Sequence, residues 1–169
     1  MFKKITERFE YSFSVSKDGV HLITITARCR SGAQIGIRGG EDLILALDGR
    51  QFREVPALDK PQYKDIAPAW SGTQLRGLQK TVVLIVAITR GDHQLTFFPT
   101  LGATLEQEPH ITAIEDATHI EFLQHDQAED GDRRPWHTFA FIGLPLKSFS
   151  AGITTHWRGV DHDDVKLIV

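Results

Sequence analysis

The fold predicted for this chain is decided by the stretch Glu41-Asp42-Leu43-Ile44-Leu45-Ala46-Leu47-Asp48-Gly49. Two acidic residues begin it, an apolar run follows, and an Asp-Gly pair ends it. A short apolar run between turn residues is typical of a buried β-strand, and Asp-Gly is favoured in tight hairpin turns. We therefore expect a buried strand at 42–48 that turns at the Asp-Gly pair and returns through Phe52 and Val55.

Alternating residues predict two strands before this stretch. Residues 9–15 place aromatic and apolar side chains on one face and polar ones on the other, and residues 21–28 alternate again with many β-branched side chains. The turn Lys17-Asp18-Gly19 between them predicts a hairpin. The glycine-rich residues 30–40 predict a loop.

After the stretch comes the most hydrophobic segment, 81–89, which turns at Arg90-Gly91-Asp92 and returns through 93–98. We interpret these residues as a second hairpin and the tripeptide as its turn. Further short strands are expected within 117–125 and from 136 onward. The strongest strands predict a core that contains Leu45, Leu47, Val83, Ile85 and Leu95.

The composition is that of an ordinary globular protein: 169 residues, 41% hydrophobic and 24% charged. A formal net charge of -3 gives no general attraction to nucleic acid or anionic membranes, and no apolar run approaches the roughly 18 residues of a membrane span. We expect neither of these partners and no export signal in this chain, although a glycan-binding role would place it at the cell surface or outside the cell. Cys29, the single cysteine, is either a small core residue or a reactive thiol.

The end of the chain repeats part of the stretch 41–49. Asp163-Asp164-Val165-Lys166-Leu167-Ile168-Val169 again joins an acidic pair to an apolar strand, and the polar residues 124–135 separate the two copies. We predict a β-module at 1–128 and a second β segment at 129–169, interpreted as a truncated repeat. A terminal strand without a return strand would add to the first module's sheet or pair with another molecule, giving a homo-oligomer.

Acidic turns are the candidate metal ligands, because calcium prefers oxygen ligands supplied by loops. The alternative is that these acids are solvated and blunt the sheet edges. No catalytic motif is present, so we expect no enzyme, and a metal-dependent enzyme that uses the histidines is the least favoured hypothesis. The candidate calcium ligands are Glu41, Asp42, Asp161, Asp163 and Asp164.

Aromatic residues beside loops are the candidate sugar-binding residues, since sugar faces stack on aromatic rings while their hydroxyls bind planar polar groups. Tyr63 and Trp70 lie in the proline-rich stretch 56–72, which either packs on the sheet or serves a function. The alternative is that these rings close the ends of the core. The candidates are Tyr63, Trp70, Trp136, Trp157 and Arg158.

Three stretches resemble jelly-roll carbohydrate-binding modules of families six and thirty-five. Tyr11-Ser-Phe-Ser-Val-Ser-Lys-Asp-Gly-Val-His-Leu-Ile-Thr-Ile25 is similar to their opening strands, and Leu45-Ala-Leu-Asp-Gly49 is similar to their strand that ends in Val-Asp-Gly. Ile88-Thr-Arg-Gly-Asp-His-Gln-Leu-Thr-Phe97 resembles their late hairpin. The family's usual Glu-x-Glu calcium pattern is not matched, because Glu7 and Glu10 have a different spacing.

The resemblance implies one module at 9–114 and the first half of another at 130–169, of the kind that precedes catalytic domains in bacterial cell-wall hydrolases and peptidases. Together with the strand pattern it predicts an all-β, antiparallel β-sandwich of jelly-roll type. The expected function is a non-catalytic glycan-binding or accessory module of a larger bacterial protein, with no required cofactor apart from the calcium considered above. The alternative is a structural or assembly module that associates through β edges.

Overall fold

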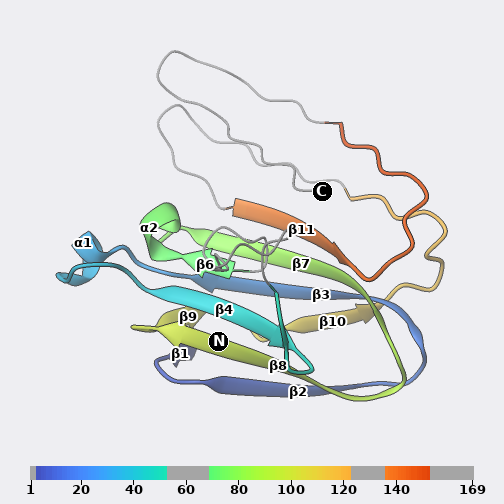
Figure 1. Cartoon of the computed structure of the whole chain (residues 1–169), viewed down its shortest axis with the longest axis horizontal. Helices are drawn as coiled ribbons and strands as arrows, with labels where there is room; N and C mark the ends of the chain where they lie inside the picture. Colours follow the sequence, from blue (N-terminus) through green and yellow to red (C-terminus); the bar gives the residue numbers. More distant parts are fainter. Residues whose placement is uncertain (1–2, 53–68, 123–135, 153–169) are drawn as a thin grey trace, which may run out of the picture.

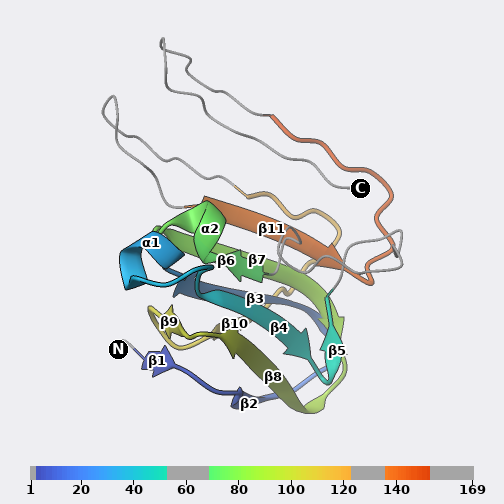
Figure 2. The same ribbon diagram turned by 60° about the vertical axis from the view of Figure 1, so that its left-hand side comes forward.

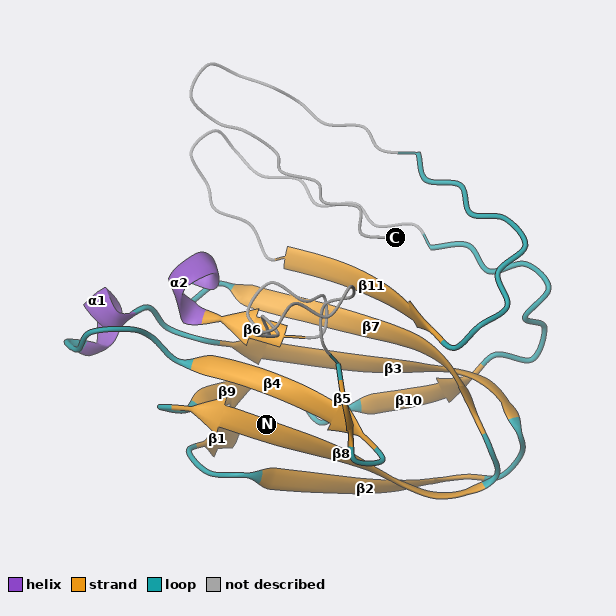
Figure 3. Ribbon diagram, in the orientation of Figure 1, coloured by secondary structure: helices purple, strands orange, loops and turns teal. Residues whose placement is uncertain are grey.

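The computed structural model describes residues 3–52, 69–122 and 136–152, and these are mostly β-strands in two sheets (Figures 1 and 3). The six-stranded sheet A has the order β1 (Lys3–Ile5), β9 (Ala103–Leu105), β3 (Gly19–Arg28), β7 (Gln79–Ile88) and β11 (Trp136–Ile142), with β10 (His110–Ala113) also paired to β3. The five-stranded sheet B has the order β2 (Phe9–Val15), β8 (Gly91–Thr100), β4 (Asp42–Leu47) and β5 (Arg50–Gln51), with β6 (Ala69–Ser71) also paired to β4. This arrangement confirms the mostly-β prediction.

Two short helices interrupt the strands. Helix α1 (Gly32–Ile35) lies in the predicted glycine-rich loop, and α2 (Gly72–Leu75) follows β6 directly. Both lie at the same end of the sheets (Figure 2).

The strand predicted at 42–48 is present as β4, and the turn at Asp48-Gly49 follows it as predicted. β4 pairs with β8, and at its end it turns back into β5 with Leu47 opposite Arg50. Asp48 and Gly49 both have positive φ, 49° and 76°, which is the backbone of a tight two-residue hairpin turn. The expected return through Val55 lies outside the described residues.

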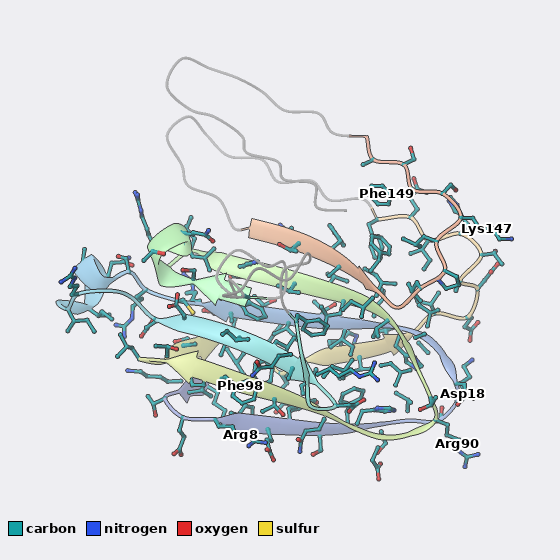
Figure 4. All side chains as sticks on the ribbon, in the orientation of Figure 1. Arg8, Asp18, Arg90, Phe98, Lys147 and Phe149 are labelled. Carbon is teal, nitrogen blue, oxygen red and sulfur yellow. The ribbon has the colours of Figure 1, made fainter. Side chains whose placement is uncertain are left out.

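The two predicted hairpins on either side are wrong. β2 and β3 belong to different sheets, as do β7 and β8, so each turn carries the chain across the core. The long strands β3 and β7 pair with each other over ten residues each, and β2 pairs with β8. The two crossing turns are joined, because the backbone N–H of Arg90 donates to the Asp18 carboxylate at 2.6 Å (Figure 4).

One core lies between the two sheets. Ile23 and Leu84 of sheet A and Leu45 and Phe97 of sheet B are at most 1% exposed. Leu45, Leu47 and Leu95 lie in this core as predicted, and Cys29 is a fully buried residue of it. Ile85 is also buried as predicted, but it leaves β7 on the face opposite Leu84 and is not part of the core between the sheets. Val83 is only partly buried, because β7 turns the alternate residues Val82, Leu84 and Val86 toward the core.

The segment after residue 128 contributes one described strand. β11 pairs with β7 along its length of seven residues, and the pairing is parallel, which corrects the expectation of an entirely antiparallel fold. Residues 117–122 and 144–152 contain no strand, which corrects the strands predicted there within the described range. The predicted strands at 154–157 and 164–169 lie outside the described residues.

Candidate functional site

A groove opens between the edges of the two sheets. β1 ends sheet A and β2 ends sheet B, and the residues of the β9–β10 connection complete the groove's wall. Its volume is about 120 Å³. The groove is lined by Lys3, Phe9, Tyr11, Leu105, Gln107, Glu108 and Pro109.

The apolar floor of the groove comes from the alternation of β2. Phe9 and Tyr11 are two positions apart, so their side chains leave the strand on the same side. Both rings pack against the core and remain partly exposed, since among the described strands β2 pairs only with β8. Phe9 also stacks on Phe97 of β8, with ring centroids 5.9 Å apart, which holds the ring in place.

Charged and polar groups surround this floor. Lys3 is paired with Leu105 across β1 and β9, so its side chain leaves the sheet on the same face as a core residue. Its ammonium nitrogen lies 3.4 Å from the centre of the Phe9 ring. Gln107 and Glu108 are exposed and line the groove, so an amide-bearing and a carboxylate-bearing residue stand beside it together with Lys3.

A separate polar cluster lies on the other face of β2. The Arg8 guanidinium donates to Glu10 at 2.5 Å and lies 5.7 Å from the Phe98 ring centre (Figure 4). The Gln94 amide donates to the other oxygen of Glu10 at 3.1 Å, and the Thr96 hydroxyl donates to Gln94 at 3.3 Å. These groups form hydrogen bonds to one another, and they are not among the residues that line the groove.

The predicted aromatic residues do not form a site in the described structure. Trp70 is 1% exposed, and its indole N–H donates to the backbone carbonyl of Lys80 at 2.9 Å, as the core interpretation of this residue requires. Trp136 begins β11 opposite Lys80, but its side chain is outside the described part. Tyr63, Trp157 and Arg158 also lie outside it.

The predicted calcium ligand Glu41 is bound by Arg30 instead. Glu41 is 2% exposed, and it accepts the Arg30 backbone N–H at 2.8 Å and a guanidinium N–H at 2.7 Å. Burial alone would raise the pKa of Glu41, but the hydrogen bonds and positive charge of Arg30 outweigh it and hold that pKa below its ordinary value. Glu41 is therefore a buried anchor of the loop between β3 and β4, and not one of the solvated acids considered as the alternative.

The other acidic candidates give no metal centre in the described residues. Asp42 follows in β4 and is 8% exposed, while Asp161, Asp163 and Asp164 lie outside the described ranges. No group of three or more histidine, cysteine, aspartate or glutamate side chains is gathered in the parts that the structure describes.

Sequence reasoning placed Phe9 and Tyr11 on the apolar face of a strand and did not consider them as site residues. Alternation identifies the buried face of β2 but not that β2 is an edge strand, where the same face is partly open. One residue, Lys3, could have indicated the groove. It stands two positions before the buried Ile5, so it lies on the core-facing side of β1, where a charged side chain needs an opening to solvent.

No protein-family model, curated protein or solved structure matches this chain. Within the described ranges, no helix has the length and apolar character needed to cross a membrane.

Proposed function

We propose that this chain is a non-catalytic glycan-binding module and that the groove between β1 and β2 is its sugar site. The supporting observation is the combination of Phe9 and Tyr11 with the polar groups of Gln107 and Glu108 in one groove. Aromatic rings stack on the apolar faces of sugars, and amides and carboxylates bind their hydroxyls. An accessory role in a larger bacterial protein, implied by the resemblance, is part of the same proposal.

The size of the groove favours recognition of a single sugar ring. Its volume of about 120 Å³ is smaller than the roughly 300–1,000 Å³ of sites that enclose a drug-sized ligand. An open groove of this size suits one residue of a longer glycan whose other residues remain in solvent.

The order of the strands supports the jelly-roll type within the two-sheet fold. The strands of sheet A run β1-β9-β3-β7, those of sheet B run β2-β8-β4-β5, and β1, β2, β3 and β4 alternate between the sheets along the chain. Jelly rolls are two-sheet folds of eight strands connected in this crossing manner, and they are common in lectin domains.

A glycan array with the full chain tests this proposal. Glu108→Ala and Tyr11→Ala should lose binding to the glycan that the wild type selects. Glu115→Ala, an exposed acid outside the groove, and Phe13→Ala, a partly exposed aromatic on the same strand outside the groove, are the matched controls. Folding is checked by thermal melts. Binding that survives both groove substitutions in folded protein would reject this site.

A second candidate function is assembly through β edges. β11 stands at the end of sheet A, and the segment after it exposes Leu146 by 52% and Phe149 by 53% (Figure 4). The Phe149 ring meets Phe141 of β11 edge-on, with ring centroids 5.8 Å apart, so Phe149 is adjacent to this strand. Light scattering tests it: a homo-oligomer that the double substitution Leu146→Ser with Phe149→Ser converts to monomer would support assembly, and a wild-type monomer would reject it.

A further inference from the structure

The groove already holds a cation from the protein itself. The Lys3 ammonium lies 3.4 Å from the centre of the Phe9 ring, well inside the ~6 Å over which a ring attracts a cation. This attraction arises because the face of an aromatic ring carries negative charge density.

We propose that the groove selects an amino sugar, whose ammonium group takes the position of the Lys3 ammonium over Phe9. This inference rests on the proposed glycan-binding function and names the class of sugar. In the absence of glycan, Lys3 occupies the position and competes with the ligand.

The charges of the lining residues favour a cationic ligand. Lys3 and Glu108 are the charged residues among those that line the groove. When an amino sugar displaces Lys3, a positive charge replaces a positive charge, and Glu108 remains as its partner. A neutral sugar offers the ring no charge, and an acidic sugar would bring a second negative charge near Glu108.

The position of Lys3 allows its ammonium to leave the Phe9 ring when the ammonium of a sugar binds there. It stands in a strand of three residues at the end of sheet A, and its side chain is exposed. A lysine carries its charge on a flexible four-carbon stem, so the ammonium can move into solvent while the backbone stays paired with Leu105. The ring itself stays in place, because Phe9 stacks on Phe97.

The test compares three tetrasaccharides by calorimetric titration of the full chain at mildly acidic pH, where the sugar amines are protonated. They are the tetramers of glucosamine, of N-acetylglucosamine and of galacturonic acid. We expect the glucosamine tetramer to bind most tightly. The N-acetylated tetramer has the same ring without the charge, so it isolates the contribution of the ammonium.

Variants then test the competition. Lys3→Met should tighten binding of the glucosamine tetramer by about two- to fivefold, which corresponds to removing one exposed cation–π competitor of about 0.5–1 kcal/mol. Glu108→Gln should weaken it. Lys4→Met is the control, because Lys4 is also exposed but does not line the groove, and it should change nothing.

The outcomes separate the two proposals. If the N-acetylated or the galacturonic tetramer binds as tightly as the glucosamine tetramer, the amino-sugar assignment is wrong and the glycan-binding function stands. Weaker glucosamine binding by Lys3→Met would also overturn the assignment, since Lys3 would then be a ligand and not a competitor. If none of the three binds and the glycan array is empty as well, the glycan-binding function itself fails.

Discussion

The imidazole of His93 is hydrogen-bonded to the carboxylate of Asp48, with 2.8 Å between Nδ1 and Oδ2. Its other nitrogen, Nε2, lies 2.8 Å from the backbone carbonyl of Thr89. A carboxylate and a carbonyl only accept hydrogen bonds, so this arrangement favours the imidazolium, in which both ring nitrogens donate, over either neutral tautomer. The same Asp48 carboxylate accepts the backbone N–H of Gln94 at 2.9 Å, so the pair ties the β4–β5 turn to β8.

This pair predicts that stability falls as the pH rises above the ordinary histidine pKa of about 6.5. Burial alone would lower the pKa of His93, but its bonds to Asp48 and Thr89 and the charges of Asp48 and Asp92 raise it above the ordinary value. A raised pKa in the folded state stabilises the fold below the unfolded value, about 6.5, and this stabilisation is lost as the pH rises through the folded value. Thermal melts at a series of pH values from below 6.5 upward should show a falling melting temperature. His93→Gln should make the melting temperature depend less on pH. An exposed control, His119→Gln, should leave the slope unchanged.

The ion pair of the buried Glu41 with the half-exposed Arg30 should contribute more to the free energy of unfolding than a pair in which both side chains are exposed. Glu41→Gln removes the charge from a side chain that is 3% exposed and accepts several hydrogen bonds, so we expect unfolding to become easier by about 1.5–3 kcal/mol. Glu10→Gln, at an ion pair whose side chains are 62% and 43% exposed, should cost no more than about 1 kcal/mol. Urea unfolding measures both. Equal losses would show that Glu41 does not anchor the loop.

Two residues on the same face of β7 test the packing of sheet A. Ile85 is fully buried, and Val83, two positions earlier, is only partly buried. Ile85→Ala should destabilise the protein by about 2–5 kcal/mol. Val83→Ala should cost clearly less. Chemical denaturation provides the comparison, and a melt that Ile85→Ala leaves unchanged would contradict the assignment of this strand.

Cys29 should be chemically inert while the protein is folded. The side chain is fully buried, and burial followed by the negative charges of Glu41 and Asp42 raises the pKa of its thiol. Since the thiolate is the reactive form, a colorimetric thiol reagent should react slowly with native protein and at once in denaturant. Rapid reaction of the native protein would mean that this end of the core opens readily.

The strands could be predicted from the sequence, but their partners could not. A period of two residues identified β2, β3 and β8, because it reports which face of a strand is buried, and a continuous hydrophobic run identified β7. It does not report which strand lies alongside, so turns such as Lys17-Asp18-Gly19 were interpreted as hairpins although they cross between the sheets. The parallel pairing of β11 with β7 has no local signal either.

The candidate site depends on this same missing information. Tyr11 looks like a core residue in the sequence, and it borders a groove only because β2 ends its sheet. Trp70 looks like a loop aromatic, and it is buried because β6 pairs with β4 and places Trp70 opposite Leu43. For Tyr11 and for Trp70, the expected and the observed positions differ because of pairing between strands that are far apart in the sequence. Residue types and their spacing do not report that pairing.

The proposed sugar site is tested most directly by a nuclear magnetic resonance titration of the labelled full chain with the glycan that the array selects. The account predicts that the largest shifts belong to the backbone amides of Phe9, Tyr11, Gln107 and Glu108, with little change around Phe98 on the opposite face of sheet B. Shifts centred on Arg8 and Phe98 instead, or no shifts at a glycan concentration that saturates the array signal, would contradict it.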